Sequence, residues 1–144
     1  MKTDINLSVS KPASQVWDYF LDLSKVPEWS TGVLEARHEG SGPPRVGGRV
    51  VHRVRMMGRT REVVYEITAF QPGSELGMSS IAGPMPTRLH MQLSPAGGST
   101  RVRVHIEASP GGLLKLARPV LEPALRRTFE NDFATAKQKI EAGE

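Results

Sequence analysis

The sequence predicts an α+β fold in which a curved, seven-stranded antiparallel sheet wraps around a long C-terminal helix, with two short helices after the first strand. Three observations support this prediction. The chain opens with a polar–apolar alternation, continues through six strand-like segments, and closes with apolar residues at helical spacing. The 14 glycines and 11 prolines in 144 residues provide the turns between the strands.

The first strand and the two short helices come from the beginning of the chain. Residues 2–10 alternate between apolar and polar, which is typical of a half-buried strand. Pro12 suits the first position of a helix, where an N–H group has no intrahelical partner, and the apolar spacing predicts a helix over 12–21. Asp22 is a candidate cap for a second short helix, which Pro27 would end.

Turn residues divide the middle of the chain into six further strands. Gly58-Arg59 is typical of a tight hairpin turn, and Gly-Pro or Pro-Gly pairs separate several of the other segments. Short connections of this kind favour a meander of antiparallel strands. The predicted strands are 33–39, 49–57, 60–70, 75–82, 87–93 and 100–108.

The C-terminal segment changes to a helical period. A separate helical turn is predicted over 113–118, and the long helix begins near Pro119 or Pro123. An antiparallel sheet with one apolar face needs a covering element, and this helix is the only large amphipathic segment left, so we expect a single domain over 1–144. The apolar residues that would face the sheet are Leu125, Phe129, Phe133, Ala136 and Ile140.

Composition and charge exclude several classes of protein. Without cysteine the chain has no disulfide, no thiolate nucleophile and no Cys-ligated metal centre. It shows no secretory signal and no apolar run long enough to cross a bilayer, so we expect a cytoplasmic protein without stable membrane insertion. The 19 Lys+Arg and 15 Asp+Glu give a net charge of +4, which is too modest to indicate a particular partner.

Short motifs along nearly the whole chain carry a family resemblance. They are Val16-Trp17, Asp22, Pro27-Glu28-Trp29, Gly47-Gly48-Arg49, Phe70-Gln71-Pro72 and Gly98-Ser99-Thr100-Arg101-Val102. In their order and spacing they resemble the START-like (SRPBCC) superfamily, in its polyketide cyclase/dehydrase and lipid-transport branch. The resemblance implies the helix-grip fold and a tunnel for a hydrophobic ligand between the sheet and the long helix.

The superfamily includes lipid and sterol carriers, polyketide cyclases, plant hormone receptors and toxin-like partners of antitoxins, so the fold leaves the function open. The leading hypothesis is a non-catalytic domain that binds a small hydrophobic molecule, such as a lipid, a sterol-like molecule or a polyketide. One alternative is an enzyme, a polyketide cyclase or dehydratase. A second alternative is a toxin-like or regulatory domain that binds another protein through the basic sheet face. A homodimer also stays open.

His52 and Tyr65 are the candidate acid–base pair of the enzyme alternative. His52 shares its strand parity with Val50 and Met56, and Tyr65 shares its parity with Ile67. Both side chains are therefore predicted to face the cavity. The competing interpretation is that they are core residues with ordinary hydrogen bonds, because buried polar groups are usually satisfied by neighbouring protein groups. No catalytic residue is assigned beyond these two candidates.

Apolar and aromatic residues between the sheet and the helix are the candidate ligand contacts. Methionine is flexible and fits irregular ligands, which favours a pocket, although stripes of this kind also form ordinary cores. Trp29 would either close one end of the tunnel or pack the short helix in place. The candidate ligand-binding residues are Trp29, Met56, Tyr65, Met78, Leu89, Met91, Leu125, Phe129 and Phe133.

No motif predicts a metal, a cofactor or a nucleic-acid partner. The four histidines lack the paired spacing of zinc ligands, and no phosphate-binding loop or dinucleotide fingerprint is present. Strand parity places His90 and His105 on the outer face, and His38 lies at a strand end, where exposure is expected. Basic residues crowd the same outer face without interleaved aromatic residues for base stacking. They are Arg53, Arg55, Arg59, Arg61, Arg88, Arg101 and Arg103.

Overall fold

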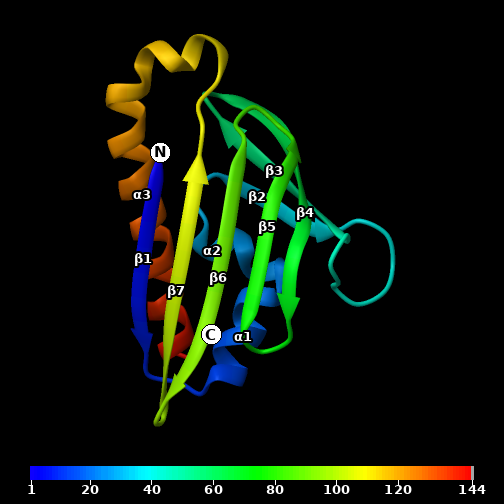
Figure 1. Cartoon of the computed structure of the whole chain (residues 1–144), viewed down its shortest axis with the longest axis vertical. Coiled ribbons are helices and arrows are strands. Elements are labelled where there is room, and N and C mark those ends of the chain that lie inside the picture. The colour runs from blue at the N-terminus through cyan, green and yellow to red at the C-terminus, as the bar shows by residue number, and fades with distance from the viewer. Residues whose placement is uncertain (144) are drawn as a thin grey trace.

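One antiparallel sheet contains all seven strands, in the order β1-β7-β6-β5-β4-β3-β2. The computed structural model describes residues 1–143. Within that range, residues 112–114 are described by their backbone alone. The helices lie together behind the sheet (Figure 1), so the predicted helix-grip fold is confirmed. The elements are β1 (Lys2–Val9), α1 (Ala13–Leu21), the 3₁₀ turn η1 (Leu23–Lys25), α2 (Val26–Trp29), β2 (Val33–His38), β3 (Arg49–Met56), β4 (Arg59–Gln71), β5 (Glu75–Ala82), β6 (Thr87–Ala96), β7 (Ser99–Ala108), the 3₁₀ helix η2 (Gly112–Ala117) and α3 (Arg118–Glu141).

Pro27 does not end the second short helix, contrary to the sequence prediction. Asp22 caps η1, where its carboxylate accepts a hydrogen bond from the backbone N–H of Ser24 at 3.1 Å. Helix α2 follows directly, with Pro27 in its first turn. Proline is tolerated there because the first N–H groups of a helix have no partner within it. The helical segment therefore continues to Trp29.

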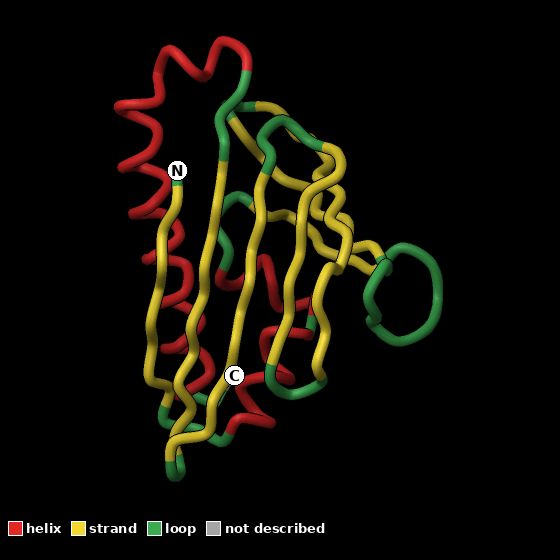
Figure 2. Tube along the Cα trace, in the orientation of Figure 1, coloured by secondary structure: helices red, strands yellow, loops and turns green. Residues whose placement is uncertain are grey.

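The sheet bends most where its pairing is irregular. The hairpin between β3 and β4 turns at Met57-Gly58, one residue earlier than predicted, and both residues have a positive φ, 51° and 77°. Register shifts interrupt the pairing of β2 with β3 and of β4 with β5. Such bulges bend a strand and increase its twist. The trace in Figure 2 shows this side of the sheet curving away from the flatter strands.

A core of fully buried side chains lies where β1, β6 and β7 meet α1 and the C-terminal half of α3. The predicted helix face enters this core through Phe133, Ala136 and Ile140, none of which is more than 2% exposed. The same cluster of buried side chains includes Val9, Val16, Val102, Val104 and Ile106.

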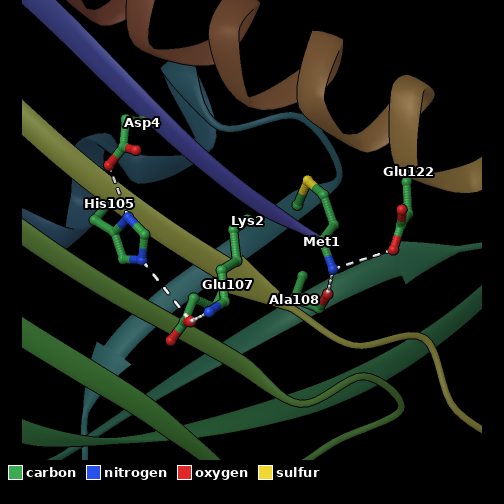
Figure 3. A network of polar contacts seen from close by, with 7 residues as sticks. All are labelled: Met1, Lys2, Asp4, His105, Glu107, Ala108 and Glu122. Carbon is green, nitrogen blue, oxygen red and sulfur yellow. Dashed lines mark hydrogen bonds and ion pairs between the residues drawn. The ribbon is translucent and has the colours of Figure 1, made fainter.

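Polar contacts tie the N-terminal half of α3 to the edge of the sheet (Figure 3). The Met1 amine donates a hydrogen bond to the Ala108 carbonyl at 2.8 Å and lies 3.1 Å from the Glu122 carboxylate of α3. On the outer face, Nδ1 of His105 lies 2.7 Å from a carboxylate oxygen of Asp4. Exposed ion pairs contribute only about 0–1 kcal/mol, so we expect most of the stability to come from the apolar core.

Candidate functional site

A cavity of about 280 Å³ lies between the β3–β6 part of the sheet and the helices α2 and α3. Its wall is almost entirely apolar, because the strands contribute their inward-facing side chains and α3 contributes its apolar stripe. An engineered apolar cavity of about 150 Å³ is large enough to bind benzene. The cavity of this protein therefore has room for a molecule of about two aromatic rings.

All nine candidate ligand-binding residues lie on the wall of this cavity. Alternation along β5 and β6 turns Met78, Leu89 and Met91 inwards, and the helical repeat of α3 turns Leu125 and Phe129 towards the sheet. Of these five, only Met91 is fully buried, at 2% exposure. The other four are Trp29, Met56, Tyr65 and Phe133. That these residues contact a ligand stays a prediction.

Trp29 lines the cavity together with two phenylalanines. Its ring centroid lies 5.4 Å from that of Phe20 and 5.1 Å from that of Phe133, and the two phenyl rings are 5.8 Å apart. Aromatic pairs at these separations attract each other by about 0.5–1.5 kcal/mol beyond their burial. Because the cluster joins α1, α2 and α3, Trp29 both packs its short helix and forms part of the cavity wall.

His52 and Tyr65 lie side by side on neighbouring strands and line the cavity. In the β3–β4 register Val50 pairs with Tyr65 and Val63 pairs with His52, which places the two ring centroids 5.0 Å apart. Neither side chain has a hydrogen-bond partner among the described residues. The structure therefore argues against the interpretation that both are core residues with ordinary hydrogen bonds.

Burial determines the protonation of this pair. Desolvation lowers the pKa of His52 to about 4 and raises the pKa of Tyr65 to about 12. At pH 7 the imidazole is therefore neutral and the phenol keeps its proton. A neutral imidazole and a phenol can each donate and accept hydrogen bonds. The pair thus offers hydrogen bonds to the cavity without offering a charge.

Asp132 is a candidate site residue that the sequence reasoning missed. It lines the cavity, is only 5% exposed, and accepts hydrogen bonds from the backbone N–H of Thr31 at 3.1 Å and from its hydroxyl at 2.5 Å. Burial raises the pKa of this carboxyl, although the Thr31 hydrogen bonds act in the opposite direction. The sequence held a signal, because Asp132 lies three residues after Phe129 and four before Ala136, on the same helix face.

All four histidines follow strand parity, but one expectation based on a strand end fails. His90 and His105 lie on the outer face, where each contacts a carboxylate at 2.7 Å. The expected exposure of His38 is wrong, since it is half-buried and lines the cavity at the end of β2, where it pairs with Val50. Within residues 1–143 no three potential metal ligands cluster, and no helix has the length and apolar character needed to cross a membrane.

Several solved structures share this fold at low sequence identity. TTHA0849 from Thermus thermophilus matches with a TM-score of 0.82 at 14% identity, covering 100% of this chain and 99% of that one. A START superfamily protein from Mycobacterium smegmatis matches with 0.71 at 13% identity, covering 98% and 94%. The Zhui aromatase/cyclase from Streptomyces sp. R1128 matches with 0.75 at 12% identity, covering 98% and 93%. Similarity at these identities shows the fold alone.

Sequence comparison identifies the family. A comparison with curated proteins gives no match. The family model described as polyketide cyclase / dehydrase and lipid transport, however, matches residues 4–141. That range runs from β1 to the end of α3 and includes every residue of the cavity wall. The chain therefore belongs to the polyketide cyclase / dehydrase and lipid transport family.

Proposed function

We propose that this protein binds a small hydrophobic molecule in the cavity between the sheet and α3, and holds it without transforming it. The observation that carries this proposal is the apolar cavity of about 280 Å³ beside a densely packed core. At about 24 cal/mol per Å³, a closed and empty cavity of this size would cost on the order of 7 kcal/mol, which is the upper limit for a pocket that is partly open to solvent. That cost is comparable with the whole free energy of unfolding of many domains. A ligand that fills the cavity would offset part of it.

The composition of the wall supports an adaptable binding site. Met56, Met78 and Met91 all line the cavity. The unbranched side chain of methionine adopts several conformations at small cost and follows the shape of the molecule that it contacts. The wall therefore suits ligands of related but not identical shape.

A cyclase or dehydratase activity is the second candidate. The observation that favours it is that His52 and Tyr65 lie side by side in the cavity wall without hydrogen-bond partners among the described residues. Efficient general acids and bases usually have pKa values near the working pH. The pKa values of about 4 and about 12 make His52 a weak base and Tyr65 a weak acid at pH 7. Binding is therefore better supported than catalysis. The protein-interaction alternative, the cytoplasmic location and a homodimer stay predictions.

A fluorescence titration with the neutral two-ring probe 6-propionyl-2-(dimethylamino)naphthalene tests the binding proposal. Met78→Trp adds bulk inside the cavity, whereas Met57→Trp adds the same bulk in the β3–β4 turn, where the methionine is 84% exposed. We expect Met78→Trp to lose affinity at least about tenfold and Met57→Trp to match the wild type. Equal affinities for the two variants, or no probe uptake by the wild type, would contradict the proposal. Native mass spectrometry after organic extraction identifies any co-purified molecule.

A further inference from the structure

We propose that the ligand is a compact, uncharged hydrophobic molecule that presents a carbonyl or hydroxyl oxygen to His52 and Tyr65, and that the cavity discriminates against carboxylates. This inference rests on the proposed binding function and specifies its ligand class. It makes His52 and Tyr65 specificity-determining residues.

The polar groups of His52 and Tyr65 lie close enough together to bind one ligand atom. His52 and Tyr65 face the cavity from adjacent strands, with ring centroids 5.0 Å apart, so one ligand oxygen can reach both side chains. Neither has a hydrogen-bond partner among the described residues. Their polar atoms are not among the buried side-chain atoms that lack a partner, so they are open to the cavity, where a ligand oxygen can form a hydrogen bond with them. The phenol would donate to a carbonyl, and the imidazole would donate or accept.

The charged residues of the cavity wall do not favour an anionic ligand. Among the described residues, the cavity is lined by no lysine, by one arginine, Arg55, and by two histidines, His52 and His38. Arg55 is exposed, and alternation with His52 along β3 directs its side chain to the outer face. Asp132 is the acidic group of the wall, and its carboxylate already accepts two hydrogen bonds from Thr31. A ligand carboxylate would therefore lose its hydration without gaining a cationic partner.

The volume of the cavity limits the size of the ligand. A cavity of about 280 Å³ is roughly twice the volume that accommodates benzene. A two-chain lipid is far larger than this, whereas a molecule of about two rings, or a single short chain, fits. The ligand class is therefore a small molecule with an apolar skeleton and a single polar end.

Displacement of 6-propionyl-2-(dimethylamino)naphthalene by matched naphthalenes tests the ligand class. Measurements are made at pH 8, where an ordinary histidine is uncharged and 2-naphthoate is ionised. Methyl 2-naphthoate and 2-naphthoate share a skeleton and a carbonyl but differ in charge. We expect the ester to bind at least about tenfold more tightly to the wild type.

The hydrogen bond is tested by comparing 2-acetylnaphthalene with 2-ethylnaphthalene, which has the same shape without the oxygen. Tyr65→Phe should weaken the ketone about threefold to tenfold and leave the hydrocarbon unchanged. His52→Phe should weaken 2-naphthol by a similar factor, because the imidazole loses its role as partner of the hydroxyl. His90→Phe, which replaces a histidine on the outer face, is the control and should change none of these affinities.

The outcomes separate the two proposals. If the naphthalenes bind but Tyr65→Phe changes the ketone and the hydrocarbon equally, or if 2-naphthoate binds as tightly as its ester, the ligand class is wrong and the binding function stands. If the wild type takes up neither the probe nor any naphthalene, the binding function fails and the ligand class fails with it. Thermal unfolding of each variant confirms that the affinities refer to folded protein.

Discussion

The two halves of the sheet meet the same helix in different ways. Beside β1 and β7, the C-terminal end of α3 buries Ala136 and Ile140 almost completely, whereas towards β3–β6 its residues Leu125, Phe129 and Phe133 border a cavity. The pairings of β7 with β1 and β6 run without a register shift, but those of β2 with β3 and β4 with β5 are bulged. Regular pairing keeps one half against the helix, and the bulges let the other half curve away. The same helix and sheet thus enclose both a filled core and a cavity.

The largest expected change in stability comes from truncating one aliphatic side chain of α3 in each half. Ile140→Ala leaves a void in the filled half and should lower the free energy of unfolding by about 2–5 kcal/mol. Leu125→Ala removes a half-buried side chain that already borders the cavity and should cost less than about 2 kcal/mol. Urea unfolding measures both values. Equal losses would show that the two halves are packed alike.

The next effect concerns the neutral histidine of the cavity wall. The pKa of His52 falls from 6.5 to about 4 on folding. Between these two pH values, His52 binds a proton in the unfolded chain but stays neutral in the folded protein. The free energy of unfolding should therefore fall as the pH is lowered from 6.5 to 4, by up to about 3 kcal/mol from this group. His52→Phe should make the fall shallower in urea titrations at pH 7 and pH 4.5. The control His90→Phe, at a half-buried histidine that does not line the cavity, should keep the steep pH dependence that His52 gives the wild type.

The smallest effect concerns the buried carboxyl of Asp132, whose pKa is raised above the ordinary value of 3.8. The folded protein therefore holds this proton more tightly than the unfolded chain, and the free energy of unfolding falls as the pH rises through the raised pKa. Asp132→Asn removes this dependence and keeps both contacts with Thr31, since the amide can accept from the N–H and donate to the hydroxyl. We expect a gain of about 1 kcal/mol or less at pH 7.

Unfolding curves of Asp132→Asn at pH 7 and pH 3 check this prediction, because the gain should vanish where the aspartate of the wild type is protonated. Asp18→Asn replaces an exposed carboxyl and serves as the matched control, with no change expected at either pH. A loss of stability in Asp132→Asn at pH 7 would show that the charged hydrogen bonds to Thr31 outweigh the cost of burying the carboxylate.

Much of the cavity wall was predictable because side-chain direction follows from local periodicity. Strand alternation turned His52 and Tyr65 inwards, and helical spacing placed Phe129 on the face that meets the sheet. Pro27 and His38 were predicted wrongly, because the effect of a residue near the end of an element depends on the next element. Pro27 fits the first turn of α2, which follows η1 directly. His38 lines the cavity because it pairs with Val50 of β3, whose strand continues the cavity wall.

By itself, the sequence determined the order of helices and strands, the inward and outward faces of most strands, and membership of the family. The tertiary structure alone decided where the interior is empty, which polar side chains lack partners, and that Thr31 bonds to Asp132 across 101 residues of chain. The reason is physical. Periodicity is a property of neighbours along the chain, whereas packing and hydrogen-bond satisfaction depend on distant segments that folding brings together.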